Sequence, residues 1–193
     1  MRSLGSVAGG VASGADRMTA YFYRFDCIGR DTVARSLPAD LKMRCWQPDL
    51  DGFPPPRSRR PSNLFWCALA RIGGFARGGF AELRIELNGE TLHRLIVTPA
   101  WYRFPFMSRG DLQIGDVWTA PSARRRQLAR MAIAEAHRRF GTKCARFWYV
   151  TDASNEPSAA LAQSCGYHLV AVGRRTHGFG IGLLGQYRIE QLV

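Results

Sequence analysis

Lysine is nearly absent from this strongly basic chain of 193 residues. All but two of its 27 basic residues, Lys42 and Lys143, are arginine, and with 15 acidic residues the net charge is +12. A planar guanidinium binds phosphate with two parallel hydrogen bonds, whereas an ammonium acts as a point charge. The composition therefore favours an anionic partner: a phosphorylated cofactor, a nucleic acid or an anionic surface. The alternative is that the arginines only cover a solvated surface.

Long apolar runs and metal-binding motifs are also missing. No apolar run reaches the roughly 18 residues of a membrane span, so we predict no membrane partner. The five cysteines form no Cys-x-x-Cys pair and no cluster with histidine, which predicts no metal site. Dispersed cysteines in odd number fit a reducing cytoplasm. With 46% hydrophobic residues, the chain nevertheless has enough apolar material for a core.

The first 17 residues contain no continuous apolar segment of the kind that a secretory signal needs. We predict a disordered N-terminal arm over residues 1–17. Met18 follows this arm and is an alternative start of the protein. The remainder, 18–193, has the length of a single domain.

Proline and charge divide the first half of the chain into short elements. An aromatic stretch at 21–27 predicts a strand, and Asp31 is a good N-cap for a helix towards residue 41 that Pro38 interrupts. Residues 47–63 hold five prolines and three arginines, which predicts a long surface loop. The apolar run at 64–72 predicts another strand.

The second half alternates strands and helices. Asn88-Gly89 between two alternating segments is a strong hairpin signal. Helical spacing over 124–140 and a capping Asn155 predict two helices, and an aromatic connector precedes them at 101–107. We therefore expect a mixed α/β domain. The strands predicted for this half are 80–87, 91–97, 112–119, 145–150, 168–172 and 181–189.

A tight turn joins the strand at 112–119 to the helix that we predict from Arg124. Backbone N–H groups in such a turn and in the first helical turn lack internal partners and lie at the positive end of the helix dipole. Arg124, Arg125 and Arg126 surround them with positive charge, which predicts a diphosphate site. The alternative is an ordinary surface helix with a basic first turn, although arginine there opposes the dipole.

Two motifs carry the most specific information in the chain. The first is Thr119-Ala-Pro121 followed by Arg124-Arg-Arg-Gln127-Leu-Ala129, and the second is Asn155-Glu-Pro-Ser158-Ala-Ala-Leu161-Ala162-Gln-Ser-Cys-Gly166-Tyr167. In order and spacing they resemble the two motifs of the GCN5-related N-acetyltransferase (GNAT) family. Those read Val-x-Pro with Arg/Gln-x-x-Gly-x-Gly/Ala, and Asn-x-x-Ala-x-x-Leu-Tyr-x-x-x-Gly-Phe. The resemblance extends over residues 112–167.

The resemblance implies a fold and an acyl donor. The fold would be mixed α/β, with a central, mostly antiparallel twisted sheet, a V-shaped splay between two parallel strands, and flanking helices. Acetyl-CoA would bind with its pantetheine arm along the strand end, its diphosphate at the turn, and its distal part near the second motif. The residues implied are Trp118, Thr119, Arg124, Arg125, Arg126, Gln127, Leu128, Ala129, Asn155 and Ser158.

Three residues depart from the family pattern. Arg125 and Gln127 replace glycines, so the approach of phosphate depends on whether Gln127 can adopt a suitable φ. Ala162 stands where the family often has the tyrosine that protonates the leaving thiolate. Tyr187, on the last predicted strand, is the candidate replacement for that acid.

A general base is missing from the expected strand as well. The resemblance places this position at Gln113, which cannot accept a proton but can orient a water. Asp111 and Asp116 are the nearby acids, and alternation along the strand places Asp116 on the face opposite Gln113. Proximity and backbone N–H donors can still lower the barrier without either group.

The resemblance predicts an N-acyltransferase that moves acetyl from acetyl-CoA to an amine by direct attack, with proton transfer relayed by water. The acceptor, a small-molecule or protein amine, would lie between the loop at 47–63 and the final hairpin. Aromatic residues of the 101–107 connector either line its pocket or close the core. Ala162 and Gln113 favour the alternative, a non-catalytic module of this fold that binds CoA, a partner protein or nucleic acid. Either protein could be a homodimer.

Overall fold

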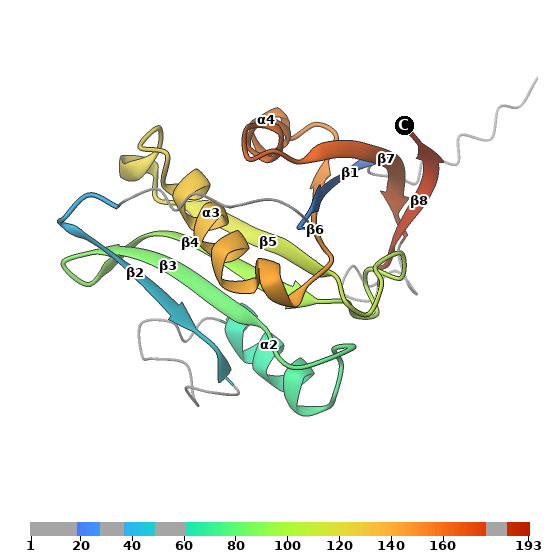
Figure 1. Ribbon diagram of the computed structural model, residues 1–193, viewed down its shortest axis with the longest axis horizontal. Helices are drawn as coiled ribbons and strands as arrows, with labels where there is room; N and C mark the ends of the chain where they lie inside the picture. The colour runs from blue at the N-terminus through green and yellow to red at the C-terminus, as the bar shows by residue number, and fades with distance from the viewer. Residues whose placement is uncertain (1–18, 28–36, 49–60, 177–184) are drawn as a thin grey trace, which may run out of the picture.

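One eight-stranded sheet organises the described part of the chain, which in this computed structural model comprises residues 19–27, 37–48, 61–176 and 185–193. Its spatial order is β2-β3-β4-β5-β6-β1-β7-β8, and every neighbouring pair is antiparallel except β5 and β6, which are parallel (Figure 1). The strands are β1 (Thr19–Asp26), β2 (Leu41–Trp46), β3 (Ala81–Leu87), β4 (Glu90–Pro99), β5 (Leu112–Thr119), β6 (Arg146–Asp152), β7 (His168–Arg175) and β8 (Tyr187–Leu192).

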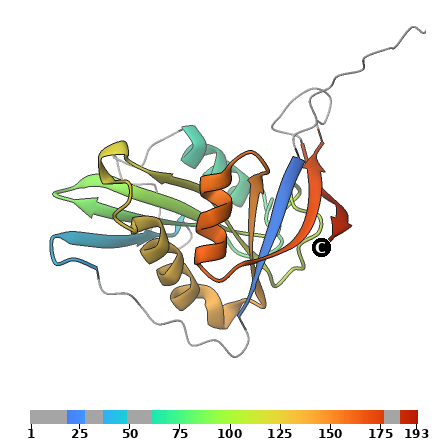
Figure 2. The same ribbon diagram turned by 90° about the horizontal axis from the view of Figure 1, so that it is seen from above.

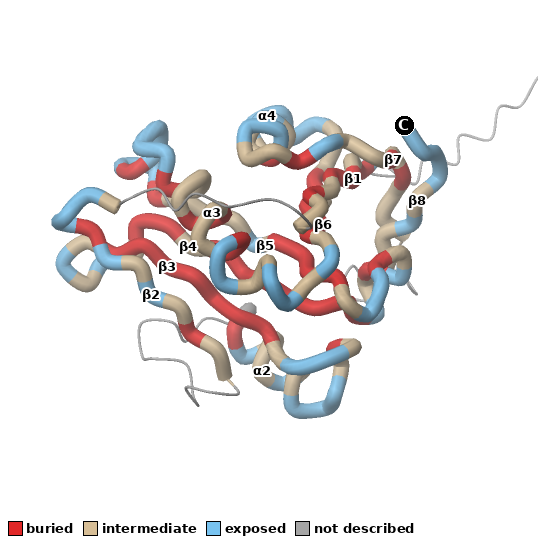
Figure 3. The backbone as a smooth tube through the Cα atoms, viewed as in Figure 1, coloured by how far each residue is buried: buried red, intermediate tan, exposed pale blue. Residues whose placement is uncertain are grey.

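Helices cover both faces of the sheet (Figures 1 and 2). On one face α3 (Leu128–Phe140) packs on β3, β4 and β5, while α4 (Glu156–Ser164) packs on β1, β6 and β7. On the other face α2 (Pro61–Arg71) joins the aromatic connector to form a second core. Buried residues follow the central strands between these layers (Figure 3). The mixed α/β fold predicted from the sequence is confirmed.

The apolar run at 64–72 is helix α2, and the predicted strand there is wrong. Phe65, Trp66 and Leu69 pack against the second core, whereas Leu64, on another side of the helix, is 54% exposed. Apolar residues on the outer side hid the helical period, because a run without polar breaks resembles a buried strand. None of the described helices is long and apolar enough to cross a membrane.

The predicted helix towards residue 41 does not extend into the described residues. Residues 37–40 form a turn, and β2 follows it, paired with β3. Its alternating Leu-Lys-Met-Arg-Cys sequence is the period-two pattern of a strand with one face buried. The end of the predicted 47–63 loop is the start of α2. The predicted arm (1–17), residues 28–36 and 49–60, and the start of the last predicted strand (181–184) lie outside the described residues.

The hairpin predicted at Asn88-Gly89 is confirmed. It joins β3 to β4, and both turn residues have positive φ, at 49° and 81°. Two left-handed residues in a two-residue loop match the twist of the flanking strands, and asparagine and glycine adopt that conformation at least cost.

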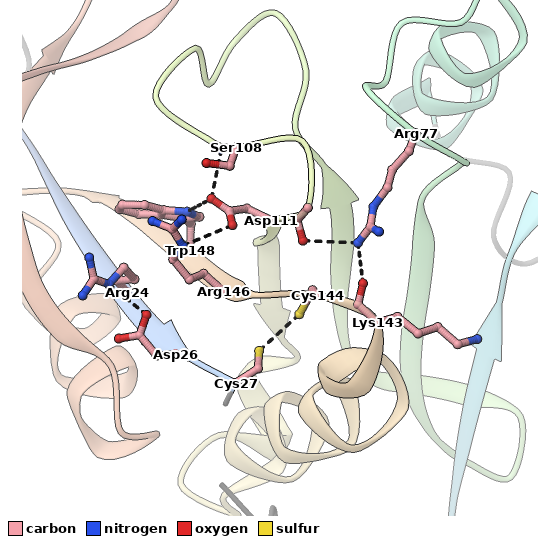
Figure 4. Close-up of polar contacts among 11 residues, drawn as sticks. Arg24, Asp26, Cys27, Arg77, Ser108, Asp111, Lys143, Cys144, Arg146 and Trp148 are labelled. Atoms are coloured by element: carbon pink, nitrogen blue, oxygen red, sulfur yellow. Dashed lines mark hydrogen bonds and ion pairs between the residues drawn. The ribbon is translucent and has the colours of Figure 1, made fainter. Parts of the chain in front are cut away.

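Polar contacts, of which those of Asp111 are buried, fasten the start of the parallel pair (Figure 4). The Asp111 carboxylate is fully buried, accepts hydrogen bonds from the Ser108 N–H at 3.0 Å and the Trp148 indole at 2.9 Å, and pairs with Arg146 at 3.4 Å. Arg77 donates to the carbonyl oxygens of Gly110 and Lys143, which precede β5 and β6. These contacts hold β5 and β6 together at one end. They also occupy Asp111, so this acid is structural.

Candidate functional site

The parallel strands β5 and β6 pair at one end only. The ladder joins Leu112–Ile114 to residues 147–149 and then stops, whereas β5 stays paired with β4 as far as Thr119. From Gly115 onward one edge of β5 therefore has no β6 partner. The two strands form the V-shaped splay that the sequence predicted.

A β-bulge interrupts β5 inside this splay. Asp116 has a φ of 47°, and the register with β4 moves from Ile96–Gly115 to Arg94–Trp118, so that two residues of β5 oppose one of β4. The extra residue breaks the alternation of side chains. The prediction that Asp116 faces away from Gln113 is therefore wrong: both line one pocket.

On the α3–α4 side, the splay opens into a cavity of about 700 Å³, which we call the splay groove. Its walls come from the end of β5, the loop before α3, the first turn of α3, strand β6 and the start of α4. Of the residues predicted to bind the donor, Arg126 alone does not line it. The others do, and they are Trp118, Thr119, Arg124, Arg125, Gln127, Leu128, Ala129, Asn155 and Ser158.

The helix predicted from Arg124 begins only at Leu128. Arg125 and Gln127 have positive φ values of 64° and 59°, which an α-helix cannot include, so residues 124–127 form a loop. These are the two residues that stand where the family pattern has glycine. Alternation of left-handed residues with others turns successive N–H groups towards a common side, as in anion-binding nests. Gln127 thus adopts the glycine-like conformation on which the predicted phosphate site depends.

The N-terminus of α3 has no side-chain cap: Gln127 is the N-cap residue, and its side chain makes no capping hydrogen bond. The exposed side chains of Arg124 and Arg125 stand beside it in the groove lining. Leu128 is buried, so it contributes backbone only. Sequence reasoning missed Arg130, which lines the groove from the first turn of α3 and donates to the Ser164 carbonyl at 3.2 Å. With α3 starting at Leu128, Arg130 is the third residue of the helix and therefore lies in its first turn.

Behind the strand end lies a buried histidine to which sequence reasoning gave no role. His93 Nδ1 is 2.8 Å from the Thr119 hydroxyl, and no described residue hydrogen-bonds its buried Nε2. Burial, reinforced by the neighbouring Arg94, lowers the pKa of His93 to about 4. A neutral imidazole therefore holds the Thr119 side chain. Arg94 itself lies 4.7 Å over the Trp118 ring.

Tyr149 is a second groove residue that sequence reasoning missed, because it lies within a nearly continuous apolar strand. Its hydroxyl is 2.8 Å from that of Ser158, and burial raises its pKa against the opposing effect of this hydrogen bond. Asn155 caps α4 by accepting from the Ser158 N–H at 3.1 Å. Ala162 is fully buried and does not line the groove.

On the α2 side, the splay borders a cavity of about 600 Å³, which we call the aromatic pocket. Gln113 and Tyr187, the two predicted catalytic residues, both line it, and neither lines the splay groove. The Gln113 amide is held by the Thr98 hydroxyl at 3.1 Å and the Ile114 carbonyl at 2.9 Å. The Tyr187 ring stacks on Phe104 at 5.4 Å.

The two cavities border the splay from the two sides of the sheet. In β5, Asp116 lines the aromatic pocket and the next residue, Val117, lines the groove; in β6, Tyr149 lines the groove and Val150 lines the pocket. Two ligands approaching from opposite faces of the sheet would therefore come together between these strands. Within the described ranges, no three histidine, cysteine or acidic side chains gather in a metal-binding arrangement.

Comparison with known proteins agrees with this geometry. The sequence profile described as the acetyltransferase (GNAT) family matches residues 39–167, which is more than half of the chain. The chain therefore belongs to the GNAT family. No curated protein matches it in sequence.

Solved structures show the same fold. A tandem GNAT protein from the clavulanic acid biosynthesis pathway superposes with a TM-score of 0.55 at 13% identity, over 80% of this chain and 51% of its own. A GCN5-related N-acetyltransferase from Sphaerobacter thermophilus gives 0.54 at 15% identity, over 81% and 50%. A structural-genomics protein from Drosophila gives 0.54 at 17%, over 81% and 49%. The chain thus spans about half the length of these proteins.

Proposed function

We propose that the chain is an acyl-CoA-dependent N-acyltransferase that moves acetyl from acetyl-CoA to an amine by direct attack. The observation that carries the proposal is the continuous splay groove, which runs from the open edge of β5 to the uncapped N-terminus of α3. An extended thiol arm fits the strand edge, and a diphosphate fits the helix terminus.

The groove residues divide by the part of the donor that each would hold. N–H groups of the 124–127 loop and of the first turn of α3 would bind the diphosphate, with the Arg124 and Arg125 guanidinium groups beside it. The open edge of β5 at Trp118 and Thr119 would pair with the amides of the pantetheine arm. Asn155 and Ser158 would face the part of the donor near α4.

Acetyl-CoA supplies a thioester whose carbonyl carbon an amine can attack. The acceptor must first lose one proton from its ammonium form to become a neutral amine with two N–H hydrogens. After the attack, the new amide keeps one of these hydrogens. The departing thiolate must gain a proton to balance the loss of the second. We assign the second transfer to the Tyr149 hydroxyl, because a raised pKa keeps it protonated near neutral pH and because Tyr149 is the last residue of β6 that pairs with β5, at the start of the splay. Gln113 would orient the water that takes the first proton.

A non-catalytic binding module is the second candidate, and the buried Ala162 favours it. An alanine without access to the groove cannot replace the tyrosine of the family motif. Such a protein would keep the groove and bind CoA, a partner protein or nucleic acid without turnover.

Two measurements separate the candidates. Calorimetry with acetyl-CoA and with CoA measures donor binding, and an assay for free thiol over a panel of amines measures transfer. The proposed enzyme binds acetyl-CoA and releases thiol only when an acceptor amine is present. Binding without thiol release for any amine would favour the module, as would salt-sensitive binding of nucleic acid without CoA binding.

A further inference from the structure

The aromatic pocket carries charges of opposite sign, on Asp116 and on Arg103. We propose that this pocket binds the acceptor, and that the acceptor is a zwitterionic amine with an apolar body, its ammonium towards Asp116 and its carboxylate towards Arg103. This inference rests on the proposed function, because the pocket gains an acyl donor only through the splay groove.

Rings form the walls of the pocket. Phe65 and Trp66 come from α2, Trp101 and Phe104 from the connector, and Tyr187 from β8. They also pack on one another, with Trp66 and Trp101 edge-to-face at 5.2 Å. Such a wall is preformed and excludes water from a flat or branched apolar group. A sugar or another strongly hydrated acceptor would leave its hydroxyl groups unpaired there.

One end of the pocket offers hydrogen-bond donors to an anion. The Arg103 guanidinium lies 5.2 Å over the Trp101 ring, and the Trp101 indole N–H is buried without a hydrogen-bond partner among the described residues. Burial lowers the pKa of Arg103, and the charge of Arg175 lowers it further. A second guanidinium, that of Arg175, lies 5.8 Å from the Tyr187 ring centre. A carboxylate bound here would add a negative charge beside two guanidinium groups and could accept a hydrogen bond from the indole.

The other end lies at the splay. The Asp116 side chain is 36% exposed, and its 3.6 Å ion pair with Arg94 is longer than a hydrogen bond, so the carboxylate can also accept from an ammonium. Because the next residue lines the splay groove, an amine held by Asp116 stands beside the thioester position. The bulge is what places Asp116 in the lining of the same pocket as Gln113.

The charge balance argues against polycationic acceptors. Among the described lining residues one side chain is acidic and one is basic, and each has another arginine beside it, Arg94 or Arg175. The whole chain carries a net charge of +12. A polyamine or an aminoglycoside would meet repulsion during approach and inside the pocket. An acceptor that brings its own carboxylate would not.

The test uses the full chain and a panel of four amines. Phenylalanine is a zwitterion whose two charges are close together, and 4-(aminomethyl)benzoic acid is a zwitterion whose charges lie at opposite ends of the ring. Phenethylamine lacks the carboxylate, and spermidine is a polycation. We expect thiol release with at least one zwitterion at a kcat/KM roughly tenfold or more above that of phenethylamine, and none with spermidine. The zwitterion with the higher kcat/KM indicates which spacing between ammonium and carboxylate the pocket prefers.

Variants then test whether Arg103 binds the carboxylate of the acceptor. R103Q is expected to raise the KM for the zwitterion roughly 10- to 100-fold and to leave that for phenethylamine unchanged. The control R188Q removes an exposed arginine one residue beyond Tyr187 and should change neither.

The outcomes distinguish failure of the proposed function from failure of the inference about the acceptor. Failure of acetyl-CoA to bind in calorimetry overturns the proposed function. Binding of acetyl-CoA with transfer to phenethylamine or spermidine but to no zwitterion overturns this inference and leaves the function standing. Without turnover, calorimetric binding of a zwitterion to the CoA-loaded wild type but not to R103Q supports the pocket, and equal or absent binding contradicts it.

Discussion

Two residues in the loop before α3 hold a backbone conformation that glycine would adopt more easily. Arg125 and Gln127 both have positive φ, and the side chain of Gln127, the N-cap residue of α3, makes no capping hydrogen bond. A left-handed conformation costs a residue with a Cβ about 1–2 kcal/mol relative to the right-handed one. Both residues line the splay groove, and strained backbone of this kind is common where a loop binds a ligand.

Replacing Gln127 tests this cost. Gln127→Gly and Gln127→Ala both remove the side chain, but only glycine relieves the left-handed strain. We expect the glycine variant to be more stable than the alanine variant by about 1 kcal/mol in the free energy of unfolding measured with urea. Equal stabilities, or a more stable alanine variant, would show that the residue is not left-handed in solution.

His93 makes stability depend on pH. Its pKa is lowered to about 4 in the folded chain, against about 6.5 when unfolded, so only the unfolded state takes up a proton between these values. Stability is therefore full above pH 6.5 and falls as the pH drops towards 4. We expect about 3 kcal/mol of this loss to come from His93.

Denaturant titrations from pH 7 to pH 4 measure this loss. In His93→Gln the fall in unfolding free energy should be smaller than in the wild type by about that amount. His168→Gln, at an exposed position of β7, should retain the wild-type profile. A His93 variant whose stability falls as steeply as that of the wild type would contradict the account.

Tyr149 is the proposed proton donor, and removal of its hydroxyl tests that role. We expect Tyr149→Phe to lower kcat roughly 100-fold and to leave the affinity for acetyl-CoA unchanged. Tyr21→Phe is the matched control on neighbouring β1, and it should keep the wild-type kcat. Unchanged turnover in Tyr149→Phe would remove Tyr149 from the mechanism.

At the scale of elements, the sequence predicted best where turn chemistry was strong. The Asn88-Gly89 hairpin, strand β5 with identical bounds, and the Asn155 cap of α4 all agree with the structure. The error at α2 has a tertiary cause, because its outer side carries apolar residues such as Leu64. The start of α3 was misplaced because arginine and glutamine do not reveal positive φ.

Much of the candidate site was also accessible from the sequence, because one contiguous motif forms its loop and helix start. Tyr149 and His93 were not, since their roles depend on tertiary contacts, with Ser158 of α4 and with Thr119 of β5. The facing of Asp116 was not accessible either, because a bulge shifts alternation without a sequence signal of its own.

The loop before α3 should bind the donor partly through charge. We expect the double variant Arg124→Gln/Arg125→Gln to weaken CoA binding roughly tenfold and to reduce its dependence on salt, because two positive charges leave the groove. Binding of pantetheine, which lacks the diphosphate, should not change. A loss of pantetheine binding as well would indicate damage to the groove rather than loss of charge.

At the scale of the whole molecule, two cavities lie on the two sides of the sheet, and both border the region where β5 and β6 part. The α3–α4 face provides the loop and helix terminus for an anionic donor, and the α2 face provides an aromatic pocket with charged ends. The buried Asp111 contacts hold the closed end of the V. Gln113 and Tyr187 both line the aromatic pocket, where we propose that the acceptor binds.

The most direct test of the central claim is a titration of the 15N-labelled chain with CoA, followed through the backbone amide signals. The account predicts the largest shifts at residues 124–130, next to the α3 N-terminus, and further shifts at 117–119 along the open edge of β5. Shifts confined to residues away from the splay groove, or no shifts at saturating CoA, would contradict it.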